Sequence, residues 1–159
     1  MKVRLFWKQF LSLIESDNLM NKQEILKNVR SMGRGTLGEA LGIEITDIGK
    51  EYVSGKMPVD HRTKQPFGLL HGGASVALAE TLGSIGALMQ IDTRRNSAVG
   101  IDINASHLRS VNDGWVHGTA NMIRAGNKIQ VWDIEILDDN KNLVCKSRLT
   151  VANIRNHVK

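Results

Sequence analysis

The feature that most constrains the fold is an almost wholly apolar segment in the middle of the chain, "QPFGLLHGGASVALAETLGS", residues 65–84. Over residues 72–90 apolar side chains fall on every side of a helix, which predicts a helix that the rest of the fold encloses. Gly83 and Gly86 leave room for another element to pack very close to it. Glu80 interrupts this apolar run, and a carboxylate in such a helix requires a specific reason.

The rest of the chain predicts an antiparallel sheet. Two short strands are expected at residues 43–47 and 52–58. After the helix, "AVGIDINASHLRS" alternates apolar and polar residues, and three further runs follow between turn signals, at residues 115–124, 128–137 and 143–154. We interpret these four runs as an antiparallel meander. One apolar helix and one mostly antiparallel sheet make an α+β fold in which the sheet wraps the helix.

The N-terminal part predicts helices that precede this arrangement. Residues 3–16 and 22–32 have helical spacing, and Thr36 and Glu39 are spaced as a capping box for a short helical turn. Residues 1–19 carry an amphipathic pattern whose purpose the sequence leaves open.

Length and composition fit one globular domain with an extension. The chain has 159 residues, 42% of them hydrophobic and 23% charged. We divide it into an N-terminal helical extension, residues 1–35, and a main domain, residues 36–155. Seven of its 21 Lys and Arg residues lie in the first 34 positions, and only seven residues are aromatic. We therefore expect a solvated basic arm and no nucleic-acid surface.

No run of the sequence reaches the roughly 18 uninterrupted apolar residues expected of a membrane span, so we expect no membrane partner. The apolar beginning of the chain is broken by Lys8 and lacks a signal-peptide cleavage site. A single cysteine, Cys145, and five histidines without metal-ligand spacing predict a cytoplasmic protein with neither disulfide nor metal.

A specific pattern surrounds the glutamate: Gln65, five residues, His71-Gly72-Gly73, six residues, Glu80, three residues and Ser84. Together with "NASHLRS" on one predicted strand and "GNKIQVWDIEI" on a later one, this pattern resembles the hotdog-fold acyl-CoA thioesterases. Among them it looks most like the bacterial 1,4-dihydroxy-2-naphthoyl-CoA hydrolases and their 4-hydroxybenzoyl-CoA thioesterase relatives. The similarity extends over residues 36–155.

The resemblance implies a hotdog fold that hydrolyses an acyl-CoA thioester, especially an aromatic one such as the 1,4-dihydroxy-2-naphthoyl-CoA of menaquinone biosynthesis. It implies that Glu80 is the nucleophile or general base and that the Gly72 N–H polarises the thioester carbonyl. It also implies Gln65 as a second orienting donor, Ser84 aligning water or the carboxylate, and His71 near the leaving sulfur. The family builds its site across a homodimer, so Glu80 and Gln65 are expected from different subunits, within a tetramer.

Elementary physical chemistry supports these roles. The first N–H groups of a helix lack intrahelical partners, so the N–H of Gly72 or Gly73 can polarise an oxygen, helped by the helix dipole. Such a donor stabilises the oxygen most strongly when negative charge develops on it in the transition state. Glu80 lies two turns further along, and Ser84 is one turn beyond it on the same face. An ionised carboxylate among apolar neighbours needs a donor, and Ser84 is the candidate.

Coenzyme A carries phosphate groups, so cations and backbone donors are expected near its binding site. His107 and Arg109 alternate onto one face of their predicted strand, and Gly126, Asn127 and Lys128 form a turn that suits a phosphate. We expect these residues to bind the CoA part of the substrate, with no separate cofactor.

Several alternatives stay open. Glu80 has a purely structural role if it is a buried acid that pairs with an arginine. His71 has a purely structural role if it only caps the helix. A broad-specificity or phenylacetyl-CoA-type thioesterase is the enzymatic alternative, although that branch commonly carries Asp where this chain has Glu80. A non-catalytic acyl-CoA-binding hotdog protein is the alternative of another class. Cys145 has no histidine at a defined spacing, which argues against a cysteine nucleophile.

Overall fold

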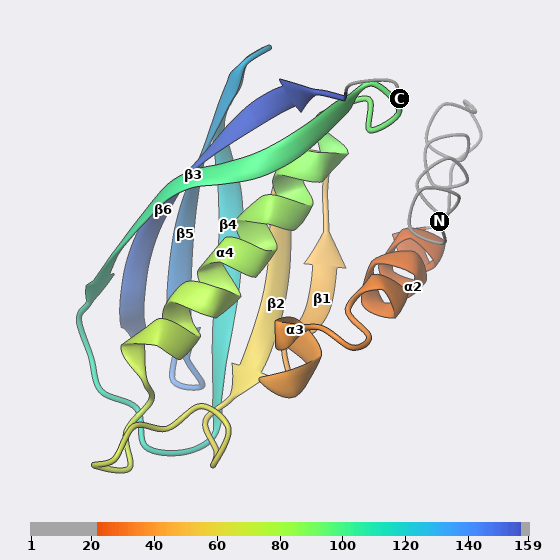
Figure 1. The fold of residues 1–159 in the computed structure, drawn as a ribbon. Coiled ribbons are helices and arrows are strands. Elements are labelled where there is room, and N and C mark those ends of the chain that lie inside the picture. Colours follow the sequence, from red (N-terminus) through yellow and green to blue (C-terminus); the bar gives the residue numbers. More distant parts are fainter. Residues whose placement is uncertain (1–21, 157–159) are drawn as a thin grey trace.

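The structure, a computed structural model, describes residues 22–156 (Figure 1). The helix expected at residues 3–16 therefore lies outside the described residues. The elements in chain order are α2 (Lys22–Met32), α3 (Leu37–Ala40), β1 (Glu44–Ile48), β2 (Tyr52–Pro58), α4 (Gly72–Met89), β3 (Asn96–His107), β4 (Trp115–Ala125), β5 (Ile129–Asp138) and β6 (Leu143–Arg155). A curved six-stranded antiparallel sheet carries α4 on one face, which confirms the predicted α+β arrangement.

The predicted meander is wrong in one respect, the place of β3. The strand order is β1-β2-β4-β5-β6-β3, so only β4, β5 and β6 form a meander. β3 pairs with β6 over almost its whole length and forms one edge of the sheet, whereas β2 is the neighbour of β4. Alternation along a strand reports which residues face the core, and it carries no information about which strand lies beside it.

Close packing between α4 and the sheet depends on glycine, as expected. A β-carbon placed on Gly83 would lie 2.6 Å from Leu149 Cδ2, and one on Gly86 would lie 2.6 Å from the Trp132 ring. From the other direction, the fully buried Leu82 inserts between Gly55 of β2 and Gly118 of β4. The helix therefore approaches the sheet more closely than side chains would permit.

A buried polar group fixes the C-terminal end of α4. Gln130 is fully buried, and its amide donates to the Ala87 carbonyl at 3.0 Å and to Asn153 Oδ1 at 2.8 Å. Its oxygen accepts from Trp132 Nε1 at 3.2 Å. Because an unsatisfied buried amide would cost about 1–3 kcal/mol, this network ties the helix end to β5 and β6.

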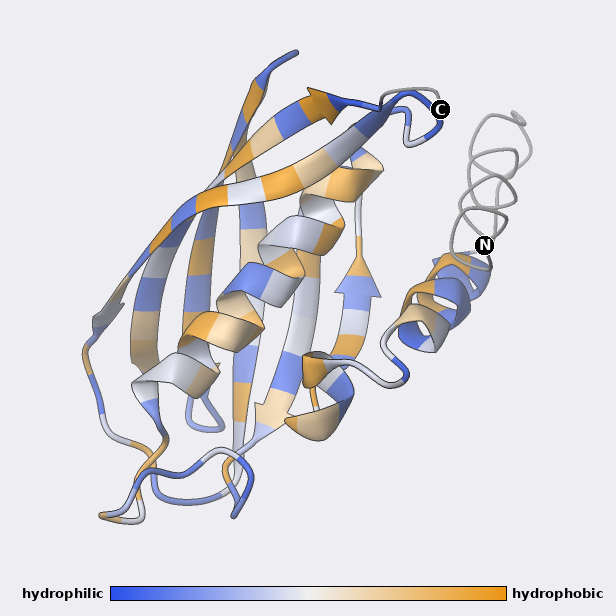
Figure 2. Cartoon of the chain, viewed as in Figure 1, coloured by the Kyte–Doolittle hydropathy of each residue, from blue (hydrophilic) through white to orange (hydrophobic). Residues whose placement is uncertain are grey.

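The prediction that the fold encloses α4 is wrong for a single chain. Buried residues, such as Ala79 and Leu82, lie on the side of the helix that faces the sheet, whereas Glu80 is exposed and Ser84 and Ile85 are only half-buried. By length and composition α4 is apolar enough to cross a membrane, but 44% of that stretch is buried inside the domain, and the absence of a membrane partner stays a prediction. Figure 2 shows it as apolar or neutral over most of its length.

The N-terminal helix α2 packs beside β1 and adds to the core. Leu26 and Val29 are buried, and Arg30 Nε donates to a backbone carbonyl of β1 at 2.9 Å. The capping box predicted at Thr36 does not form: its hydroxyl donates back to the preceding loop, and the Glu39 carboxylate accepts from a loop N–H at 2.6 Å. The division at residue 35 stays a prediction.

Candidate active site

A groove of about 390 Å³ opens at the N-terminal end of α4. Its walls come from the loop before α4, the first turn of the helix, the end of β3 with the segment after it, and β6; they are Gln65, Leu69, Leu70, Gly72, Ser75, His107, Leu108, Arg109, Ser110 and Val144. The groove thus brings together residues that the sequence assigned to two separate tasks, the chemistry and the binding of CoA.

The first turn of α4 offers one backbone N–H donor that has no hydrogen-bond partner among the described residues. His71 is the N-cap residue, and its Nδ1 accepts from the Gly73 N–H at 2.8 Å. Among the described residues the Gly72 N–H has no hydrogen-bond partner, and Gly72 lines the groove. Of the two candidate donors, only Gly72 is therefore free to polarise a ligand oxygen.

The His107 ring lies against Gly72. A β-carbon on Gly72 would be only 2.7 Å from His107 Nε2, so the glycine is needed for this contact. The sequence placed His107 with the CoA phosphates and did not predict its contact with the helix start. The strand register brings it there, because His107 is the last residue of β3, opposite Cys145.

Gln65 is held by its own loop. Its backbone N–H donates to the Leu69 carbonyl at 2.8 Å, and its side-chain oxygen accepts from the Phe67 N–H. The amide NH₂ group donates to no other residue of the described part of the chain, which fits the expected role of an orienting donor. The same tight loop presents Phe67 at 88% exposure, a feature that the sequence analysis missed.

Glu80 lies on the open side of α4, away from the groove. Its carboxylate is beside β3, where a β-carbon on Gly100 would be 3.3 Å from Oε1. No hydrogen bond joins it to Ser84 among the described residues, so the expected donor is not engaged. Glu80 comes eight positions after Gly72, a rise of about 12 Å along the helix. One chain alone therefore cannot hold one small carbonyl group against both.

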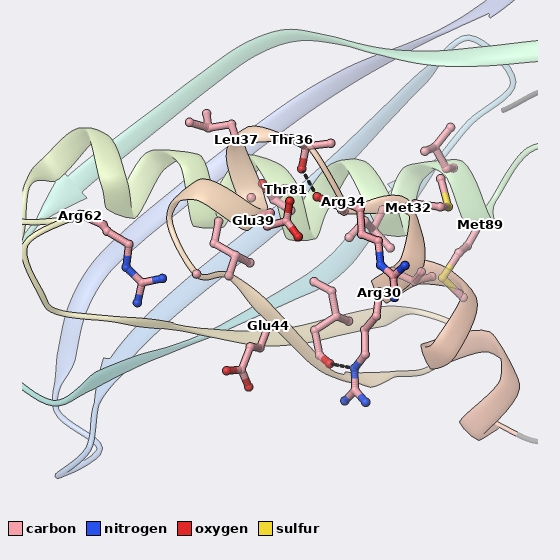
Figure 3. Close-up of a pocket in the computed structure, with 18 of the residues that line it drawn as sticks. Arg30, Met32, Arg34, Thr36, Leu37, Glu39, Glu44, Arg62, Thr81 and Met89 are labelled. Atoms are coloured by element: carbon pink, nitrogen blue, oxygen red, sulfur yellow. Dashed lines mark hydrogen bonds between the residues drawn. The ribbon is translucent and has the colours of Figure 1, made fainter. Parts of the chain in front are cut away.

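A larger cavity of about 790 Å³ lies on the flank of α4 that faces β1, between the helix, α2, α3 and β1 (Figure 3), and Glu80, whose carboxylate is turned towards β3, does not line it. On the helix it is lined by Thr81, Ile85, Leu88 and Met89. Thr81 follows Glu80 directly and is turned about 100° further around the helix. The sequence did not predict this cavity, since no motif links the segments that form it.

The turn formed by Gly126, Asn127 and Lys128 lies at the opposite end of the sheet from the groove. It follows β4 and is fastened to the end of β6 by Asn153, whose side chain donates to the Gly126 carbonyl at 2.9 Å. A single chain does not bring this turn together with His107 and Arg109.

Other chemistry finds no support among the described residues. Cys145 is buried, and burial raises the pKa of its thiol, so it is a poor nucleophile. Within residues 22–156 no three His, Cys, Asp or Glu side chains gather as metal ligands.

Comparison with known proteins identifies the family. Residues 67–145 match the thioesterase superfamily. The chain is also 46% identical over 127 residues to the 1,4-dihydroxy-2-naphthoyl-CoA hydrolase of Escherichia coli, a match that covers 80% of this chain and 93% of that enzyme. The chain belongs to the thioesterase superfamily.

Two further relatives agree. This thioesterase is 46% identical over 129 residues to the proofreading thioesterase EntH of Cronobacter turicensis, covering 80% of this chain and 92% of the relative. A crystal structure of a mutant of thioesterase PA1618 from Pseudomonas aeruginosa superposes with a TM-score of 0.81 at 40% identity, covering 82% of this chain and 94% of that chain. The predicted hotdog fold and the hydrolysis of a thioester are confirmed, and the family implies an acyl-CoA substrate.

Proposed function

We propose that this thioesterase hydrolyses aromatic acyl-CoA esters, with 1,4-dihydroxy-2-naphthoyl-CoA as the leading candidate. The observation that carries the proposal is the combination of a free backbone donor at Gly72 with an exposed carboxylate at Glu80 on one helix. The 46% identity to a 1,4-dihydroxy-2-naphthoyl-CoA hydrolase supports an aromatic acyl group.

The active site is completed by a second copy of the chain. Gly72 and Glu80 of one copy are too far apart, so the carbonyl donor comes from one subunit and the carboxylate from the other. β3 supports this arrangement, since it is a sheet edge of twelve residues with Val99 at 46% and Ile101 at 58% exposure. Gly100 belongs to this same strand, and the Glu80 carboxylate lies beside it.

Antiparallel pairing of two β3 strands would place opposite ends of the two sheets side by side. The turn of Gly126, Asn127 and Lys128 in one subunit would then lie at the same end as His107 and Arg109 of the other. Together they would supply the cations and backbone donors that the CoA phosphates need. This arrangement accounts for two groups of predicted residues that one chain keeps apart.

In the reaction the Gly72 N–H donates to the thioester oxygen as it gains negative charge. Glu80 either takes a proton from water, which attacks the carbonyl, or attacks it directly to form an anhydride that water then hydrolyses. The carbon–sulfur bond breaks and the sulfur leaves as a thiol after gaining a proton. Because His71 Nδ1 accepts from Gly73, the neutral ring carries its proton on Nε2, where it can donate to the sulfur.

A panel of CoA esters tests the substrate class. Thiol release is measured with dihydroxynaphthoyl, benzoyl, hydroxybenzoyl, phenylacetyl and fatty acyl esters. We expect kcat/KM to be highest for the esters whose aromatic ring is bonded directly to the thioester carbonyl. A preference for fatty acyl or phenylacetyl esters would favour the broad-specificity alternative, and binding without thiol release would favour a non-catalytic acyl-CoA-binding protein.

A single turnover in water enriched with oxygen-18 separates the two roles of Glu80. If Glu80 is the nucleophile, water attack on the anhydride places the label in the Glu80 carboxylate. If it is the general base, all of the label enters the released acid. Mass spectrometry of the peptide that contains Glu80 reads the difference directly.

A further inference from the structure

Gly100 lies in the edge strand β3, which runs along one flank of α4 (Figure 1). Its φ lies outside the left-handed range, so the backbone conformation does not require glycine there. Glycine also weakens a strand, because it loses the most conformational freedom on folding and has no side chain to pack. A glycine at such a position indicates that another group must come close to the strand.

A bulge in β3 ends at this glycine. Between Gly100 and Asp102, β3 has one residue more than the facing stretch of β6, and the extra residue is Ile101. Because side chains alternate along a strand, Gly100 faces the same side as Ala98, which packs against the core. After the bulge the positions that face the core are odd-numbered and begin with Ile103. Gly100 is thus the last position facing α4 before the bulge, and it has no side chain.

The Glu80 carboxylate is the near neighbour of Gly100 on this side. A β-carbon on Gly100 would lie 3.3 Å from Glu80 Oε1 and 4.0 Å from Leu149 Cδ1. Apart from the chain neighbours of Gly100, no other described residue would come within 4 Å of it. A methyl group here would therefore touch the carboxylate and cover the side of it that faces β3. The bare α-carbon leaves this approach to Oε1 open.

We infer that Gly100 is a positioning residue for the hydrolysis, because its missing side chain leaves room for the group that reacts with Glu80. The inference rests on the proposed function, in which Glu80 is the general base or the nucleophile. For the base, the room admits the attacking water, which must come within about 2.8 Å of the oxygen that accepts its proton. For the nucleophile, it admits the thioester carbon. This approach lies on the β3 side, which is also where the second subunit pairs in the proposed dimer.

Gly100→Ala tests the inference on the full chain, with benzoyl-CoA and 1,4-dihydroxy-2-naphthoyl-CoA as substrates. We expect kcat for thiol release to fall by about tenfold to a hundredfold, as for other small misplacements of reacting groups. KM and the affinity for CoA, measured by calorimetry, should change little. The melting temperature should not fall, because the one tight neighbour of the added methyl is the end of an exposed side chain.

Glu80→Asp provides the background that separates positioning from a structural effect. Its carboxylate is one methylene shorter and withdraws from β3, which leaves room for the methyl group. Adding Gly100→Ala to this variant should lower kcat by no more than about threefold, since the two sites are coupled only through their contact. An equal fall in both backgrounds would show that the effect does not pass through the Glu80 carboxylate.

Gly38→Ala is the matched control, because a β-carbon there would meet only Thr36 Oγ1, at an ordinary contact distance of 3.6 Å. It should leave kcat unchanged. Full turnover in Gly100→Ala, an equal fall in both backgrounds, or loss of the homo-oligomer on size-exclusion chromatography would overturn the role of Gly100 while leaving the thioesterase intact. Failure of the wild type to hydrolyse any ester of the panel would overturn the proposed function as well.

Discussion

The two sides of α4 have similar apolar character but different surroundings. On the side that faces the sheet, Gly83 and Gly86 allow Leu149 and Trp132 to approach, and the buried Gln130 side chain donates to the Ala87 carbonyl near the helix end. On the other side Glu80 is exposed beside the edge strand β3. One helix can therefore be apolar all round for two reasons: one side builds the core, and the other side, in our proposal, contacts a second subunit and the substrate.

Substitution on the sheet side should give the largest loss of stability. Gly86→Val forces a branched side chain into the Trp132 ring, which is fully buried and cannot move away. We expect a decrease in the free energy of unfolding of about 3 kcal/mol, at the upper end for overpacking. Urea denaturation measures it. Ala77→Val on the open side is the control, and an equal loss there would contradict the difference between the two sides.

His71 lies at the start of α4 and has two roles in this account, as the helix cap and as the proton donor to the sulfur. Variants of His71 separate these two roles. His71→Ala removes the acceptor for the Gly73 N–H and should cost about 1 kcal/mol of stability, as for other N-caps. His71→Asn keeps an acceptor and should retain most of that stability. If His71 also protonates the sulfur, both variants lose turnover; if it only caps the helix, His71→Asn stays active.

The smallest effect is expected on the pH dependence of stability, through an ion pair in the loop that carries Gln65. A hydrogen bond from Arg62 lowers the pKa of Asp60 from 3.8 to about 2. Since the pKa is lowered in the folded state, this pair stabilises the fold above about pH 4, and the contribution is lost as the pH falls towards 2. The melting temperature of Asp60→Asn should fall less steeply than that of the wild type over this range. Parallel curves would show that the pair adds nothing.

Much of the fold could be predicted from the sequence, because periodicity reports burial directly. The bounds of α4 and of the strands follow from it, and so does the close approach at Gly83 and Gly86. The position of β3 at the edge could not be predicted, since its pairing with β6 depends on contacts between residues far apart in the chain. The cavity beside α4 was missed for the same reason.

The candidate site was predictable in its residues but not in its geometry. The motif around Glu80 indicated a donor at Gly72 or Gly73, and only the bond from Gly73 to His71 leaves Gly72 as the free one. An apolar helix side gives the same pattern whether it is covered by its own sheet or by a second chain. The sequence therefore predicted an enclosed Glu80, whereas the described chain leaves it exposed.

The most direct test of the account is thiol release by Glu80→Gln beside the wild type, with CoA binding measured on both. The exchange keeps the size of the side chain and removes its charge, so fold, assembly and CoA affinity should persist. Loss of the base or nucleophile should lower turnover of aromatic esters by about 10²–10⁴-fold or more. Near-normal turnover in a folded Glu80→Gln would contradict the central claim that the exposed carboxylate on α4 performs the hydrolysis.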